Sequence, residues 1–139
     1  MSIEKGIINM SSNKRVINDF LLLYQHEMRV SGEQLTQTND NEEQIALEIE
    51  RSGTRDKIEL LQRLLQNENI EDIENELLLI IDLTFACLSV GNYSEEQQEK
   101  ILARIHKVSN QIQTISELRD PNEVIAVQKL IQKKYLKIT

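Results

Sequence analysis

One apolar stretch constrains the fold of this chain more than any other feature. Residues 77–90 read LLLIIDLTFACLSV, in which Asp82 is the only charged residue. A membrane-spanning helix needs about 20 predominantly apolar residues, so this stretch is too short to cross a bilayer. A helix that is hydrophobic on nearly every side belongs in the interior of a protein. We therefore expect a largely apolar helix over about residues 70–90 at the centre of the fold. If the other helices cannot cover it, the remaining apolar surface would be an interface that closes a homodimer or receives a helix of a partner.

The composition predicts that the other elements are helices too. The chain of 139 residues contains one Pro and four Gly, which is too few turn-forming residues for a many-stranded β architecture. Its length suits one domain. The sequence therefore predicts an all-α fold, a compact bundle of five or six helices, in a single domain over residues 13–139. Residues 1–12 lack an apolar period, and we interpret them as an N-terminal tail that could be disordered.

Apolar periodicity and capping residues place the helices along the chain. Apolar residues that recur at steps of three and four residues mark one face of a helix. Ser94 and Gln97 have the spacing of a capping box, and Pro121 suits the first position of a helix. The expected helices cover about residues 13–30, 40–52, 55–66 and 70–90, and two more start near Ser94 and Pro121. Three glycines are expected to follow helix ends: Gly32, Gly53 and Gly91.

A polar line interrupts the apolar helix over residues 70–90. Asn75, Asp82 and Ser89 lie seven residues apart and therefore share one side of that helix. Our first interpretation is a narrow stripe that faces solvent. The alternative is that Asp82 is buried and paired with a Lys or Arg, because a buried charge needs a partner.

The residues that usually carry catalysis are few. His26 and His106 belong to no metal-ligand motif, and no phosphate-binding glycine motif is present. Cys87 lies within the apolar stretch, where burial would keep a thiol unreactive. We therefore expect a protein that is not an enzyme and that uses no cofactor and no metal.

Charge and termini limit the partners and the compartment. The net charge is −7, with 23 acidic and 16 basic residues. This balance argues against nucleic acid as a partner, because phosphate binding needs clustered Lys and Arg. No secretory signal or transmembrane segment is apparent. A single cysteine cannot form an intramolecular disulfide. We expect a soluble cytoplasmic protein that does not bind membranes.

The remaining pattern favours a protein-interaction module, such as an adaptor, regulator, chaperone or immunity-type inhibitor, that binds another protein through helix faces. Residues of the fifth expected helix form an apolar seam at steps of four and three, and basic residues follow in the sixth. The candidate interface comprises Ile101, Ile105, Val108, Ile112, Ile115, Lys133, Lys134 and Tyr135. The default interpretation of the five apolar residues is core packing. Self-association is a further partner option.

A small nucleic-acid-binding regulator is the alternative. The turn expected at Gly53 could separate the two helices of a helix-turn-helix. The C-terminal segment also gathers Lys129, Lys133, Lys134 and Lys137 around Tyr135. Such a patch could contact phosphates, although lysines near a helix C-terminus also complement the helix dipole.

Overall fold

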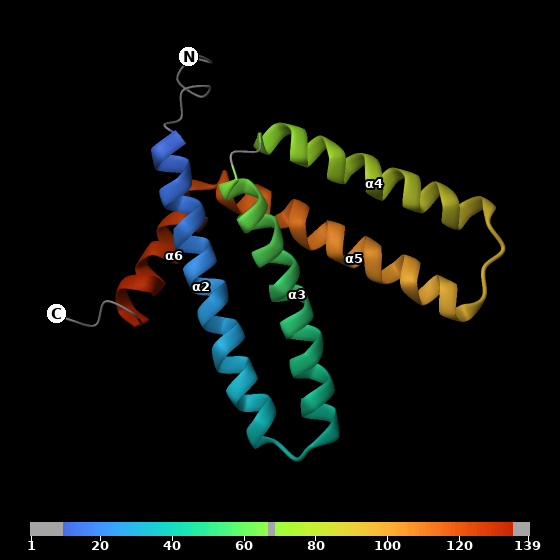
Figure 1. Cartoon of the computed structure of the whole chain (residues 1–139), viewed down its shortest axis with the longest axis horizontal. Helices are drawn as coiled ribbons and strands as arrows, with labels where there is room; N and C mark the ends of the chain where they lie inside the picture. The colour runs from blue at the N-terminus through green and yellow to red at the C-terminus, as the bar shows by residue number, and fades with distance from the viewer. Residues whose placement is uncertain (1–9, 67–68, 135–139) are drawn as a thin grey trace.

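A computed structural model describes residues 10–66 and 69–134 and shows an all-α bundle (Figure 1). Its helices are α2 (Met10–Gln37), α3 (Asn41–Leu65), α4 (Ile70–Val90), α5 (Glu95–Leu118) and α6 (Pro121–Lys134). These described ranges contain five helices and no strand. The predicted fold class is therefore confirmed. α2 begins at Met10, inside the predicted tail, and residues 1–9 of that tail lie outside the described residues.

The helix starts follow the capping signals in the sequence. The Asp40 side chain accepts a hydrogen bond from the main-chain N–H of Glu42 at the start of α3. Ser94 and Gln97 form the predicted capping box at the start of α5. α6 begins at Pro121, as expected. α4 ends at Val90, directly before Gly91, which is also as predicted.

The predicted break at Gly53 is wrong. The helices expected over residues 40–52 and 55–66 form one continuous helix, α3, with Gly53 in its interior. The Thr54 hydroxyl donates to the carbonyl oxygen of Glu50, which is a contact made within a helix. A glycine inside a helix costs roughly 0.5–1 kcal/mol relative to alanine. The packing of α3 along α2 offsets this cost, since Leu47, Leu60, Leu61 and Leu64 of α3 are all buried. The turn that the alternative helix-turn-helix interpretation needs at Gly53 is therefore absent.

The helix end predicted near Gly32 is also wrong. α2 continues through Gly32 to Gln37, so that it runs beside α3 over most of its length (Figure 1). The guanidinium group of Arg51 on α3 donates to the carbonyl oxygen of Met28 and to the hydroxyl of Ser31 on α2. These contacts hold the last turns of α2 against α3.

The hydrophobic core lies where α2, α3, α5 and α6 meet. It contains Ile17, Phe20, Leu23, Tyr24, Leu60, Leu61, Leu64, Ile73, Leu77, Val108, Ile115, Val127 and Ile131. Only two of these residues, Ile73 and Leu77, come from α4, and both lie in its first half. α4 packs mainly against α5 and lies at one side of the bundle (Figure 1). The predicted central position of this helix is therefore wrong. The other four helices supply most of the core, and α4 contributes only its first half.

Candidate functional site

α4 and α5 form a hairpin that extends away from the other helices. In Figure 1 the two helices lie side by side, and their connection is far from α2, α3 and α6. Contacts between α4 and α5 hold the hairpin together. On the side that faces α5, α4 buries Ile73, Leu77 and Thr84. The Thr84 hydroxyl donates to the carbonyl oxygen of Ile80, so this polar group is satisfied within α4.

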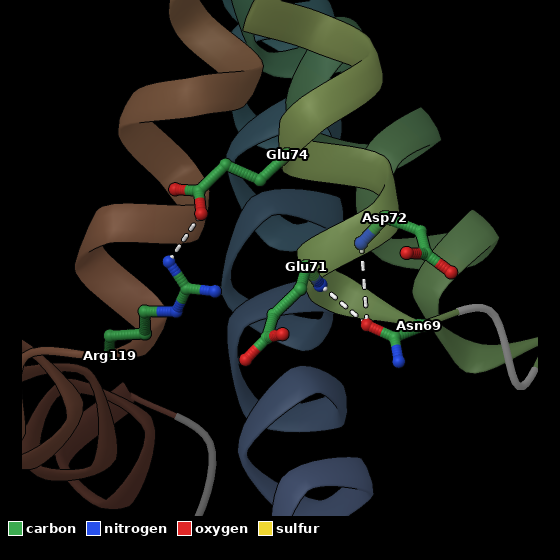
Figure 2. A network of polar contacts seen from close by, with 5 residues as sticks. All are labelled: Asn69, Glu71, Asp72, Glu74 and Arg119. Atoms are coloured by element: carbon green, nitrogen blue, oxygen red, sulfur yellow. Dashed lines mark hydrogen bonds and ion pairs between the residues drawn. The ribbon is translucent and has the colours of Figure 1, made fainter.

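Polar contacts fix the base of the hairpin (Figure 2). The Asn69 side chain accepts hydrogen bonds from the main-chain N–H groups of Glu71 and Asp72 and so caps α4. Arg119, at the end of α5, donates to Glu74 Oε1 at 2.7 Å. The cap starts α4, and the ion pair joins α4 to the end of α5 where α4 leaves the core.

A second ion pair acts at the same end of α4. Arg63 on α3 pairs with Glu76 on α4, so α4 is tied both to α3 and to the end of α5. Each of the two pairs is exposed and contributes at most about 1 kcal/mol, in line with other surface salt bridges. Their effect on the candidate site is to hold α4 in position.

Beyond this base, α4 exposes large apolar side chains. Their exposed fractions are 44% for Leu78, 58% for Leu79, 57% for Leu83, 51% for Phe85 and 87% for Val90. Single exposed apolar residues are common on protein surfaces, whereas a contiguous apolar patch marks an interaction site. These five residues share one short helix, so we take the outer face of α4 as the candidate site.

The polar line on α4 faces solvent. Asn75, Asp82 and Ser89 are all exposed, which confirms the first interpretation of this line. The alternative of a buried Asp82 is wrong. The line runs along the middle of the exposed apolar face, with Leu79 and Leu83 on one side and Leu78 and Phe85 on the other.

An open groove runs between α4 and α5 near the far end of the hairpin. Its volume is about 520 Å³, and its lining comprises Ile80, Leu83, Thr84, Cys87, Tyr93, Lys100, Ile101 and Arg104. Most of the lining surface is apolar, and the two cationic residues both come from α5. Because the groove is open and lies between two helices, it suits an amphipathic segment of a protein better than an enclosed small molecule.

The candidate interface residues on α5 separate into two groups. Val108 and Ile115 are buried in the core, as the default interpretation of the seam has it. Ile101, Ile105 and Ile112 are only partly buried. Among them Ile101 lines the groove. The second half of the seam therefore packs in the core, and its first half lies along α4.

Two of the basic residues predicted at the C-terminus, Lys129 and Lys133, lie on α6 and not on this hairpin. Lys129 and Lys133 are exposed on α6. Lys134 is the last residue of α6, and Tyr135 and Lys137 lie outside the described residues. The structure does not bring Lys133 to the groove between α4 and α5.

The residues considered for catalysis lie on three different helices. His26 on α2 contacts Arg29, with 2.8 Å between His26 Nδ1 and Arg29 Nη2. His106 on α5 is exposed. Cys87 on α4 is exposed as well, so the predicted burial of this thiol is wrong, for the same reason that α4 is not central. Within residues 10–66 and 69–134, no three His, Cys, Asp or Glu side chains are grouped to hold a metal ion.

The exposed face of α4 corresponds to the alternative in which the other helices leave part of this apolar helix uncovered. Asn75, Asp82 and Ser89 were the sequence signal for it, since a polar line is not expected on a helix that is covered on all sides. No helix in the described part of the chain is long and apolar enough to cross a membrane.

Comparison with known proteins finds no matching family, no similar curated protein and no similar solved structure.

Proposed function

We propose that this protein is a non-enzymatic interaction module that binds a protein partner through the α4–α5 hairpin. One observation supports the proposal above the others: five large apolar side chains are exposed on α4, on an element anchored at its base. Full burial of a Leu or Phe side chain contributes about 1.5–3 kcal/mol. A partner that covers this face would therefore gain substantial free energy without rearranging the core.

The shape of the surface indicates how a partner would bind. An amphipathic helix binds in a groove between two helices by inserting apolar residues spaced three and four positions apart. The groove offers an apolar floor, with Leu83 and Ile101 on opposite sides, and it offers Lys100 and Arg104 for polar contacts. Adaptors, regulators, chaperones and inhibitors all use surfaces of this kind, and we propose such a role here.

We propose the cytoplasm as the compartment. Cys87 is a free and exposed thiol. An exposed thiol persists in a reducing environment, whereas an oxidising one favours intermolecular disulfides. The groove that Cys87 lines would then stay open to a partner.

Site-specific photo-crosslinking in cells tests the proposed function. A photoreactive amino acid would replace Leu79 or Leu83 in the full chain, and Gln25, an exposed residue on α2, would serve as the control position. Mass spectrometry would identify the crosslinked products. We expect a defined protein product from both α4 positions and none from Gln25.

The outcomes separate clearly. Products from Leu79 and Leu83 that disappear when Leu78 and Phe85 are replaced by Ser would support binding through the exposed face of α4. Equal products from Gln25 and α4, or no product at any position, would overturn the proposal.

A further inference from the structure

The charges on α4 are of one sign. Between Ile70 and Val90 the charged residues are Glu71, Asp72, Glu74, Glu76 and Asp82, and no Lys or Arg occurs. The first four lie in the anchored half of the helix, where Glu74 and Glu76 already pair with Arg119 and Arg63. Asp82 is the acidic residue that lies within the exposed apolar face.

The groove beside this face has the opposite charge. Lys100 and Arg104 line it together with Leu83 and Cys87, so both cations lie at the level of the second half of α4. Within the part of the chain that the structure describes, neither Lys100 nor Arg104 has an ion pair or a hydrogen bond from its side chain. Two cations at the edge of an apolar groove would complement an acidic, apolar helix.

Among the described residues, Asp82 does not pair with either of these two cations. The Asp82 side chain also has no ion pair or hydrogen bond among the residues described. At 100° per residue it lies roughly half a turn away from Thr84 and Leu77, which face α5. Asp82 therefore points away from Lys100 and Arg104 of its own hairpin, although all three lie at a similar level along it.

We infer that the occupant of the groove is a second copy of this chain, with α4 of each copy bound against the α4–α5 groove of the other. This inference rests on the proposed function and names the partner of the same surface. α4 has the chemistry that the groove requires, an apolar face with an unpaired carboxylate and no cation. In a two-fold symmetric dimer each copy supplies both the helix and the groove, so both apolar faces are covered at once.

The charge pairs of this dimer are specific. Asp82 of one copy pairs with Lys100 or Arg104 of the other, at the border of an apolar contact made by Leu79, Leu83 and their symmetry mates. This arrangement, with an apolar centre and charges at the rim, is the usual anatomy of a protein interface.

A charge-exchange experiment with the full chain tests the inference. One chain carries Asp82→Lys, and the other carries Lys100→Glu with Arg104→Glu. Sedimentation velocity over a range of concentrations would measure the mass of each chain alone and of their mixture. The control is Glu48→Lys, the same kind of charge reversal at an exposed residue of α3. All these positions are exposed, so circular dichroism and thermal unfolding should show that every variant folds.

We expect the unmodified protein to approach a dimer of twice 16.2 kDa as its concentration rises. Each charge variant alone should dimerise about tenfold more weakly or worse, because like charges would face one another. The mixture should regain the dimer as a heterodimer, and Glu48→Lys should behave as the unmodified protein does. Regained dimerisation would establish the proposed pairing.

Two results would overturn the inference. One is an unmodified protein that stays monomeric at every concentration, and the other is a dimer that neither charge variant weakens. Both leave the proposed function to its own test, since crosslinks from Leu83 to a different protein would support that function in the absence of a dimer. A monomeric protein without crosslinks from α4 would overturn both.

Discussion

The side chain of Arg51 occupies the space in which a side chain at Gly32 would have to lie. A Cβ atom on Gly32 would be 2.8 Å from Arg51 Nη1. That same nitrogen donates to the carbonyl oxygen of Met28 at 2.5 Å and to the hydroxyl of Ser31 at 3.1 Å. Gly32 therefore allows a contact between α2 and α3 that any larger residue would disturb.

Alanine should stabilise the protein at Gly53 but not at Gly32. A Cβ atom on Gly53 would meet only Asn110 Nδ2 at 3.5 Å, an ordinary contact. We expect Gly53→Ala to stabilise the protein by about 0.5–1 kcal/mol, because alanine favours a helix interior. The free energy of unfolding of Gly32→Ala should be about 1 kcal/mol lower than that of Gly53→Ala, because Arg51 would lose its hydrogen bonds. Urea unfolding of both variants measures the difference, and a destabilised Gly53→Ala would contradict a continuous α3.

The two glycines also show what could be predicted from the sequence. Capping residues were reliable at Ser94 and Pro121, because a cap acts through its immediate neighbours. A glycine in a helix costs only about 1 kcal/mol, and packing against another helix readily exceeds that amount. Whether Gly53 ends a helix therefore depends on α2, which lies elsewhere in the sequence.

The position of α4 could not be predicted for a related reason. The sequence shows that residues 77–90 are apolar, but it does not show whether other helices cover them. In the structure Ile17, Phe20 and Leu61 fill the core together with residues from α5 and α6, so that α4 contributes only its first half. The same holds for the predicted interface on α5, since the burial of Val108 and Ile115 depends on the packing of α2 and α3.

Equal truncations at Leu61 and Leu83 should have very different effects on stability. Leu61 is fully buried, whereas Leu83 is 57% exposed on α4. Leu61→Ala should lower the free energy of unfolding by about 2–5 kcal/mol, because it leaves a cavity in the core. Leu83→Ala should change the stability of the monomer by about 0.5 kcal/mol or less, as surface substitutions usually do. Chemical denaturation at a low protein concentration makes the comparison. A loss at Leu83 comparable to that at Leu61 would show that α4 is buried.

A carboxylate at position 111 should be tolerated only at low pH. The buried Gln111 on α5 donates from Nε2 to the carbonyl oxygen of Asp56 on α3 at 3.0 Å. Burial raises the pKa of the Asp56 carboxyl group on the same residue. Gln111→Glu should lower the free energy of unfolding by more than about 1.5 kcal/mol at pH 7. The new carboxylate cannot donate to the Asp56 carbonyl oxygen, so two acceptors would face each other.

The matched variant is Gln111→Leu, which also loses the hydrogen bond but adds no charge. Its cost should be about 1 kcal/mol and independent of pH. At pH 4 the glutamic acid is partly protonated and can donate, so the difference between the two variants should shrink. Urea midpoints at pH 4 and pH 7 provide the measurement. If the difference in stability between the two variants is the same at both pH values, the carboxylate at position 111 is not buried.

Tyr24 should make the stability of the protein sensitive to alkaline pH. Its hydroxyl donates to Glu117 Oε2 at 3.2 Å, and burial, followed by the negative charge of Glu117, raises the pKa of Tyr24 well above its usual value. A group with a higher pKa in the folded state stabilises that state below its unfolded pKa, which is about 10 for tyrosine. This contribution is lost as the pH rises above 10, because the unfolded chain then loses the proton more readily. Tyr24→Phe should cost about 0.5–1.5 kcal/mol at pH 7 through loss of the hydrogen bond.

The unmodified protein should therefore lose its advantage in free energy of unfolding over Tyr24→Phe between pH 9 and pH 11. At higher pH the difference should change sign, because the folded state resists ionisation of Tyr24. Phenylalanine keeps the ring that lies 5.2 Å from Lys57 Nζ, so the cation–π contact is common to both proteins. Titration of lysines and of the other tyrosines is also common to both and cancels in the comparison. Thermal unfolding at steps of half a pH unit provides the measurement. Parallel stability curves for the two proteins would show that the Tyr24 hydroxyl ionises as easily in the folded chain as in the unfolded one.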